Sequence, residues 1–568
     1  MSSASLDAFF AHYFRTAPVN ATFTGVHEYD SLLPDWSRAA RERELVEMRK
    51  LHAALTHDYP LPASGLATLA IDPHLLDAEL ARANLDVRIA ETESHHFHDR
   101  NTALWTGEAI FGAVSLMIRD FAPAAERLPA LTARLAAVPA FLQSMRETIN
   151  EPVPELWRAR AERECGVAQE LFDAGLTAWA SESGIGELPR ELGNAATAAR
   201  EAFAEAASWL GASMRRDNAG DSVHEAGLSA GEPLLTTLLA RGHFCDEPPR
   251  ALLARAETDM SREQDALAQM LQERLLDWPG AQAAMAADRP TAAEYAGTFM
   301  RRWEEIRAGV QAYDAVSWPD WPIRYTPIPE WARRAAPQLY WLFYRSPAPF
   351  DRYDTYEYLV TPVDHTIAPD EQARRLAVWN HSTITLNHVV HHGGVGHHVQ
   401  NWHATHRSTS RVGTIAAVDC ASRIGMFMGG SMAEGWACYA TGLTEELGLL
   451  TPVEVLSEQH TRVRLLARAM VDLRLHLGDW TFAECVAYYV REVGMSVEVA
   501  TAETTKNSMF PATALMYWLG ATEILDARAR VRLRSGAGFS LRDFHDALLS
   551  RGAIPVLLAT HLMEHADA

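Results

Sequence analysis

Apolar residues recur at intervals of three and four positions through most of the N-terminal half, which is the spacing that one face of an α-helix requires. Charged residues fill the positions between them and form the faces that meet solvent. We therefore predict that this half is built from amphipathic helices. The pattern is clearest in five segments, at residues 38–55, 73–94, 125–147, 156–180 and 193–214.

The pattern changes near Ser317, where proline, tryptophan and tyrosine become frequent and short β-branched or aromatic runs appear. Such runs are typical of strands, so we expect a β hairpin or small sheet near a cleft between two helical lobes. Helical spacing returns from Pro369 and continues to a final helix that begins after Ser540, a good N-cap residue. The expected fold is mainly α, with lobes over residues 1–315 and 316–568 that form one integrated fold.

Composition places the chain among ordinary globular proteins, because 48% of its 568 residues are hydrophobic and 22% are charged. The formal net charge of -22 repels phosphate backbones and anionic lipid, so we expect neither nucleic acid nor a membrane as a partner. The N-terminus has no basic leader before an apolar stretch, and no segment offers about 18 uncharged apolar residues in a row. We expect a cytoplasmic protein that is a monomer or a homodimer.

The cysteines lie far apart and include no Cys-x-x-Cys pair, which argues against a disulfide framework and against a thiolate zinc site. We interpret them as buried free thiols. No Gly-x-Ser-x-Gly elbow supports a serine nucleophile, and no phosphate-binding loop is present. The five cysteines are Cys165, Cys245, Cys420, Cys438 and Cys485.

Seven histidines gather in NHVVHHGGVGHHVQNWHATH, residues 387–406. Histidines on one regular helix share a face only when they are three or four residues apart, whereas His391 and His397 are six apart. Three glycines between them would each cost a helix about 1 kcal/mol against alanine, so a break is expected there. Such a break lets both imidazoles turn toward one cation, and we predict a metal site. For any single histidine, a surface or hydrogen-bonded core position is the alternative.

A third ligand should come from another segment. The stretch SMAEGWACYATGL, residues 431–443, carries one acid, Glu434, among small and apolar residues. A carboxylate is expensive to bury without a partner, so we expect Glu434 to face a cation. Two imidazoles and one carboxylate leave a zinc position open to water, as hydrolysis requires. The expected cofactor is a divalent metal, with zinc favoured.

These residues resemble the bacterial family of domain of unknown function 885, whose members are regarded as zinc metallopeptidases of the all-helical zincin type. The family's His-Glu-x-x-Pro-Gly-His-x-x-Gln motif is similar to HHGGVGHHVQ at 391–400, and its Glu-Gly-Trp-Ala-x-Tyr motif is similar to EGWACY at 434–439. The resemblance spans nearly the whole chain and implies a two-lobed zincin-like fold with His391, His397 and Glu434 as metal ligands. Further matching segments are PVNATFTGVHEYD (18–30), VDLRLH (471–476), AETTKNSMFPATALMYWLG (502–520) and FHDALLSRGAIPV (544–556).

The same resemblance implies that His476 and Tyr517 stabilise an oxyanion or hold a substrate carboxylate. The spacing of the residues adds a second observation, because Asp472 lies four positions before His476. On one helix the carboxylate can orient the imidazole, and a purely structural hydrogen bond is the alternative.

One departure from the family pattern falls on a demanding position, since the glutamate that follows the first ligand is His392 here. In a metallopeptidase that glutamate takes a proton from metal-bound water and returns it to the leaving amine. The imidazole of His392 can shuttle this proton, or its neutral nitrogen can bind the metal, together with His388 one turn earlier. Further departures are Val395, Thr441, Lys506, Asn507 and Thr513.

The function that we predict is a metal-dependent hydrolase that acts on a small peptide or amide-like substrate, with His392 in place of the usual glutamate base. The alternative is a hydrolytically inactive or repurposed relative that binds peptide or metal, or that runs non-peptidase chemistry. Storage or sensing of several metal ions by the histidines is a third hypothesis.

Overall fold

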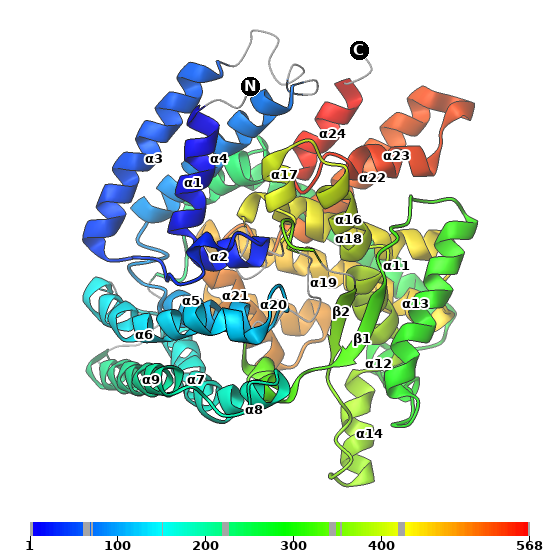
Figure 1. Cartoon of the computed structure of the whole chain (residues 1–568). Coiled ribbons are helices and arrows are strands. Elements are labelled where there is room, and N and C mark those ends of the chain that lie inside the picture. Colours follow the sequence, from blue (N-terminus) through cyan, green and yellow to red (C-terminus); the bar gives the residue numbers. More distant parts are fainter. Residues whose placement is uncertain are drawn as a thin grey trace.

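The protein is mainly helical, with one small two-stranded sheet (Figure 1). The computed structural model describes residues 4–60, 69, 72–149, 152–217, 227–339, 348–352, 355–418 and 426–565. The helices before the sheet are α1 (Ala4–Thr16), α2 (Pro18–Thr24), α3 (Arg38–Asp58), α4 (Pro73–Glu93), α5 (Thr102–Met117), α6 (Ala124–Thr148), α7 (Glu155–Glu170), α8 (Leu176–Glu182), α9 (Arg190–Asp217), α10 (Glu232–Thr237), α11 (Pro249–Glu273), α12 (Trp278–Ala287) and α13 (Tyr295–Ala312).

The helices predicted in the N-terminal half are confirmed, and their starts have a local cause. Ser37 accepts a hydrogen bond from the backbone N–H of Ala40 at the start of α3, and Asp72 does the same for His74 at the start of α4. The predicted segment 156–180 spans α7, the π-helical turn η3 (Leu171–Gly175) and most of α8. The other segments lie in α3, α4, α6 and α9.

Helices also dominate the chain after the sheet, where they build the candidate site. Ser540 caps α23 as expected, because its side chain accepts a hydrogen bond from the N–H of Asp543 at 3.2 Å. The prediction that α23 is the final helix is wrong, since α24 follows it. These elements are α14 (Pro369–Val378), α15 (His381–Thr383), the π-helical stretch η7 (Ile384–Gly393), α16 (His397–His406), α17 (Arg411–Ile415), α18 (Gly430–Glu446), α19 (Pro452–His476), α20 (Phe482–Val493), α21 (Val497–Met509), α22 (Met516–Ser535), α23 (Leu541–Leu549) and α24 (Val556–His565).

The two strands, β1 (Ile323–Pro327) and β2 (Tyr356–Val360), confirm the small sheet but not a hairpin. They pair in parallel, with Ile323 opposite Tyr356 and Pro327 opposite Val360. Parallel neighbours need a long crossover, whereas a hairpin turn joins antiparallel strands. The parallel pairing therefore corrects the hairpin expectation.

The hydrophobic cores join residues from both sides of position 315. Both ends of the described chain lie at the same side of the molecule (Figure 1) and contribute to one core. Each large core contains residues from both 1–315 and 316–568, so the cores do not separate these ranges. The division into two lobes stays a prediction. Among the described residues, the three large cores contain, in turn, Leu6 with Leu562, Ile110 with Trp331, and Leu252 with Leu473, and a fourth core is small.

Four of the cysteines are free thiols, as expected, and Cys420 lies outside the described residues. Cys165, Cys245 and Cys485 are buried, while Cys438 is half-buried. Among the described helices, none combines the length and the apolar character that a membrane crossing would need.

Candidate metal centre

The glycine-rich break between η7 and α16 is a tightly packed turn. A side chain at Gly396 would place its Cβ 1.9 Å from the carbonyl oxygen of His391, and one at Gly394 would lie 2.7 Å from that of Val389. At Gly393 the Cβ would meet the Tyr325 hydroxyl at 2.2 Å. The glycines are therefore required by close approach of backbone to backbone and to a tyrosine, in line with the expected break.

Two tryptophans from two different helices donate hydrogen bonds to this turn. The indole N–H of Trp303, on α13, donates to the carbonyl of Gly393 at 2.6 Å, and that of Trp436, on α18, donates to the carbonyl of Val395 at 2.8 Å. Both indoles are buried, so their bonds to the turn also satisfy groups that water cannot reach. The sequence pattern did not single out either residue, although Trp436 belongs to the EGWACY segment.

The turn brings three imidazoles together. The ring centroids of His391 and His397 are 4.9 Å apart, those of His391 and His392 are 4.6 Å apart, and those of His392 and His397 are 5.3 Å apart. One nitrogen from each ring lies within 4.8 Å of the other two. The predicted convergence of His391 and His397 across the break is therefore present.

Glu434 reaches the same point from α18. Its Oε2 lies 3.1 Å from Nε2 of His391 and 3.6 Å from Nε2 of His397. The carboxylate is buried, because α18 packs closely on α22 through Gly435, where a Cβ would lie 2.5 Å from the Cα of Gly520. A lone acid in an apolar helix thus faces the histidines, and its expected contact with a cation stays a prediction.

The electrostatics of the site follow from burial and from these contacts. Burial alone would raise the pKa of Glu434, but hydrogen bonds and charge from His391 and His397 outweigh it and hold the pKa well below its usual range. Burial, with the neighbouring His391 and His397, holds the pKa of His392 well below that of a free imidazole. His392 is therefore neutral beside an ionised glutamate.

The orientation of His392 is set by the backbone. Its Nδ1 lies 2.7 Å from the carbonyl oxygen of Asn387, so Nδ1–H donates and the Nε2 lone pair remains for another partner. Metal-binding histidines commonly fix their tautomer by such a bond to a carbonyl. This geometry suits a ligand and equally suits a proton acceptor.

The spacing of the donor atoms fits a small divalent cation. Two atoms that each bind one tetrahedral zinc ion at about 2.0–2.1 Å are about 3.3 Å apart. The separations of 3.1 Å and 3.6 Å between Glu434 and the two histidines lie on either side of this value. His391, His397 and Glu434 could therefore hold the metal, with His392 as an adjacent fourth donor.

The other histidines of the stretch are engaged elsewhere. The hydroxyl of Tyr358 contacts Nδ1 of His388, whose ring stacks on Trp379 at 4.7 Å between centroids. His398 lies 3.1 Å from the carbonyl of Trp321, and His403 lies 3.1 Å from that of Ser317. These contacts join η7 and α16 to β2 and to the chain before β1.

His476 is buried, and its hydrogen bonds are made to other segments than the three imidazoles. Its Nδ1 accepts from the N–H of Ala230 at 3.0 Å, and its Nε2 lies 3.0 Å from the carbonyl of Asn507. Asp472 accepts from the N–H groups of Ala512, Ala514 and Leu515 at 3.0–3.2 Å, and it lies 3.4 Å from His476. Both side chains therefore bind backbone groups of the chain just before α22.

Tyr517 stands at the start of α22, beside Arg468. The guanidinium lies over its ring at 4.6 Å, and it also pairs with Glu503 at 3.1 Å. Burial alone would lower the pKa of Arg468, but charge from Glu503, Tyr517, Tyr489 and Glu434 outweighs burial and raises the pKa. Tyr517 and Cys438 line a cavity of about 450 Å³ between α18, α19 and α22. Cys438 is one helical turn from Glu434, so this cavity adjoins the same face of α18.

The fold and the site define a mainly helical protein with a buried histidine and glutamate cluster at a break between two helices. The chain belongs to the family described as bacterial protein of unknown function (DUF885), whose model matches residues 18–563. No protein with a curated description matches it.

Two solved structures share the fold. A putative lipoprotein of unknown function from Shewanella oneidensis superposes with a TM-score of 0.76 at 19% identity, over 99% of this chain and 100% of that chain. The putative lipoprotein from Colwellia psychrerythraea gives a TM-score of 0.74 at 16% identity, over 99% of each chain. The expectation of a cytoplasmic location is corrected by these neighbours, because both are described as putative lipoproteins.

Proposed function

We propose that this protein is a metal-dependent hydrolase that acts on a small peptide or amide-like substrate. The observation that carries the proposal is the convergence of His391, His397 and the buried Glu434 on one point, although the three come from two different segments. Burial of a carboxylate beside imidazoles without a cation is costly, so the arrangement favours a divalent metal, with zinc first. The two-lobed zincin-type arrangement is part of this proposal.

His391, His397 and Glu434 would hold the cation and leave a position for substrate or water. A bound zinc ion polarises a carbonyl and makes its water a stronger acid. The chain's own contribution is to fix the three ligands before substrate arrives. The turn does this through the indoles of Trp303 and Trp436, which hold its carbonyls in place.

His392 would act as the proton acceptor in place of the family's glutamate. Its bond to Asn387 leaves Nε2 with a lone pair inside the cluster, and its neutral state makes that lone pair available. The acceptor would take a proton from water and deliver it to the leaving amine. Tyr517 stays a candidate for the group that faces the developing oxyanion.

His476 stays a weaker candidate for that role. Its two ring nitrogens contact the backbone of Ala230 and Asn507, which favours a positioning function for the segment before Tyr517. The substitution His476→Gln would separate the two roles. A positioning role predicts a lower melting temperature with an unchanged pH profile of hydrolysis, whereas a direct role predicts a changed profile.

The experiment that tests the proposal is elemental analysis of the purified protein together with a peptide and amide hydrolysis screen. We expect about one equivalent of metal per chain. His391→Ala should lose both the metal and any hydrolysis, while His406→Ala, at the exposed end of α16, should keep both. Hydrolysis that persists after complete chelation would contradict the proposal, and several ions per chain would favour storage or sensing.

A second function has one observation in its favour. A nitrogen of His392 lies within 4.8 Å of those of His391 and His397, close enough to become a fourth ligand and fill the open position. The protein would then bind metal or peptide without hydrolysis. The substitution His392→Glu separates the two functions. A gain of peptidase activity would support the hypothesis that the protein binds metal or peptide without hydrolysis. A loss of native activity would support His392 as the proton acceptor of a hydrolase.

A further inference from the structure

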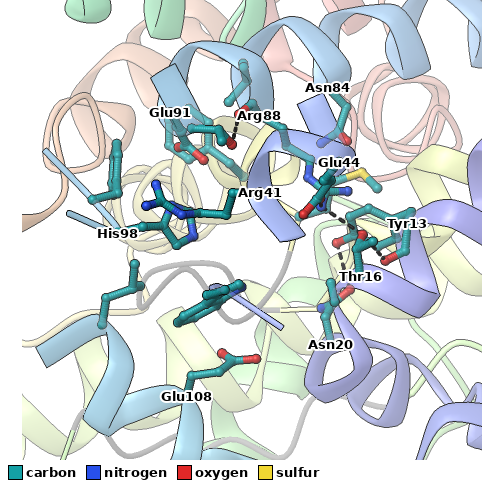
Figure 2. Close-up of a pocket in the computed structure, with 18 residues that line it drawn as sticks. Tyr13, Thr16, Asn20, Arg41, Glu44, Asn84, Arg88, Glu91, His98 and Glu108 are labelled. Atoms are coloured by element: carbon teal, nitrogen blue, oxygen red, sulfur yellow. Dashed lines mark hydrogen bonds and ion pairs between the residues drawn. The ribbon is translucent and has the colours of Figure 1, made fainter. Parts of the chain in front are cut away.

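A second polar cavity lies among the N-terminal helices, at a place that the candidate metal centre does not use. It has a volume of about 160 Å³ and is lined by α1 to α5 together with Met426 and Phe427 (Figure 2). None of its lining residues belongs to η7, α16 or α18. A closed apolar space of this size admits a molecule such as benzene, so it suits a ligand of about six heavy atoms.

The positive charges of this cavity are already balanced. The guanidinium of Arg41 pairs with Asp99 behind the wall, and that of Arg88 pairs with Glu44 and also donates to the Thr16 hydroxyl at 2.8 Å. Figure 2 shows Arg88 and Glu44 on the same side of the cavity as Thr16. An anionic ligand would therefore have to compete with carboxylates that are already in place.

Two further acids, Glu91 and Glu108, line the cavity in addition to Glu44. Glu108 stands on α5, on the far side from Glu91 (Figure 2), and in the described part of the chain it has neither an ion pair nor a hydrogen bond. Burial raises its pKa to about 7, and the charge of Arg134 offsets this in part. A cation in the cavity would restore the ionised form.

Two buried amides supply an observation that is independent of the acids. Asn84 is 3% exposed, and its Oδ1 has no hydrogen-bond partner within the described residues. Asn20 is 4% exposed; its Oδ1 accepts from Tyr13 at 2.7 Å, while its Nδ2 has no partner there. Both line the cavity, and Figure 2 shows Asn84 reaching into it from α4. An unsatisfied buried acceptor is rare, and a ligand that donates a hydrogen bond to Oδ1 of Asn84 satisfies it.

We propose that this cavity binds a small protonated organic amine that carries a second hydrogen-bond donor, with Glu108 as its counter-ion and Asn84 as an acceptor. The rings of Tyr13, Trp36 and Phe427 supply walls that suit the aliphatic body of such a cation. A dicarboxylate is not expected to bind, because the guanidinium groups of Arg41 and Arg88 already pair with Asp99 and Glu44.

The test uses three four-carbon probes on the purified protein, without removal of any metal that it carries. Isothermal titration calorimetry at about pH 8, above the pKa of Glu108, should show one site for 1,4-diaminobutane. Neutral 1,4-butanediol and dianionic succinate should bind at least about tenfold more weakly. Tighter binding of succinate, or no binding of the diamine at millimolar concentration, would overturn the proposal.

Variants then assign the binding to the cavity. Glu108→Gln and Asn84→Leu should each weaken diamine binding about tenfold or more, whereas Glu201→Gln, on the exposed face of α9, should leave it unchanged. Circular dichroism checks the fold, and Asn84→Ser replaces the leucine variant if that one is unfolded. Unchanged affinity in a folded Glu108→Gln protein would refute the assignment.

Chelation distinguishes this site from the candidate metal centre. Because no cavity residue is a proposed metal ligand, the affinity for 1,4-diaminobutane should persist after metal removal and in His391→Ala. A loss of diamine binding in both conditions would mean that the amine binds at the metal centre instead, and would overturn the proposal.

Discussion

Glu434 shows how much a single residue can reveal in the sequence. Its neighbours in α18 are small or apolar, so the pattern could predict that this acid is buried and faces a cation. The structure places its Oε2 within 3.6 Å of two imidazole nitrogens. What the pattern could not give is the close contact of Gly435 with Gly520, which lets α18 approach α22 and fixes the direction of the carboxylate.

His392 shows the opposite case. Its identity could be read from the sequence, but its tautomer depends on the carbonyl of Asn387, which lies at hydrogen-bonding distance only in the folded π-helical stretch. Tyr358 is similar, because its contact with His388 depends on how β2 packs against η7. Such contacts are set by tertiary packing and have no local signal.

A residue-scale prediction concerns His27, which bridges Asp30 and Asp351 at 2.9 Å each. Burial lowers its pKa, but the two carboxylates outweigh burial and raise the pKa to about 9. Because the folded pKa is raised, the stabilisation is fully present below about pH 6.5 and is lost as the pH rises through 9. His27→Gln should therefore lower the free energy of unfolding by about 1 kcal/mol at pH 6, since water screens the 32% exposed imidazole.

Urea unfolding of His27→Gln and of the unchanged protein at about pH 6 and pH 10 measures this difference, which should shrink toward zero at the higher pH. His57→Gln, on the exposed face of α3, is the matched control and should show no such trend. A difference that grows with pH would contradict the proposed charge state of His27.

At the scale of elements, residue spacing predicts some features of the segment from η7 to α16 but not others. Three glycines in four residues predict a break, and the break is present. The spacing did not predict that the preceding stretch is a π-helix, nor that beyond its end the N–H of Gly396 donates to the carbonyl of Val390 at 2.9 Å. The wider helical turn points His391 and His392 toward His397 together.

Gly396→Ala tests this element, because the added Cβ would lie 1.9 Å from the carbonyl oxygen of His391. We expect a loss of stability of about 2–4 kcal/mol and loss of most of the bound metal, since relief of the clash must move a ligand. Gly166→Ala is the control in α7, where nothing lies within 4 Å of the new Cβ, and it should stabilise by about 0.5–1 kcal/mol.

Chemical unfolding and metal analysis of the two glycine variants provide the measurement. If Gly396→Ala retained full metal content and stability, the close packing of the turn would not be what positions the ligands.

Asp472 and His476 make a second point at this scale. Their spacing predicts that they face the same side of α19, and they do, at 3.4 Å. The sequence left open whether the pair is chemical or structural. The answer depends on residues 507–515, whose backbone groups bond to both side chains.

At the scale of the whole molecule, the sheet and the cores follow from long-range contacts. The strands could be predicted from aromatic and β-branched runs, but their parallel pairing could not. The expected hairpin was wrong because alternation within a strand does not identify its partner. One core likewise contains residues from both ends of the described chain, among them Leu6 of α1 and Leu562 of α24.

Metal removal is the prediction at this scale. The site joins η7, α16 and α18, which all contribute to one large core, so the metal should stabilise the whole fold by linkage. At a free metal concentration about 100 times the dissociation constant, the gain is about 2.7 kcal/mol, or about 2 °C in melting temperature for a chain of this length.

Calorimetry with and without a chelator measures this shift. His391→Ala should show no response to the chelator, whereas His406→Ala should respond as the unchanged protein does. An equal response in His391→Ala would place the stabilising metal elsewhere.

The sequence by itself determined the helices, their caps, the break in the histidine stretch and the residue types that can meet a cation, because these depend on local spacing and on the energy of burying one side chain. The tertiary structure alone decided which of the seven histidines converge, that the strands run in parallel, and that an unmatched carboxyl faces a cavity among the N-terminal helices. Those outcomes depend on which distant segments pack together, and the packing free energy of distant segments is not written in any local pattern.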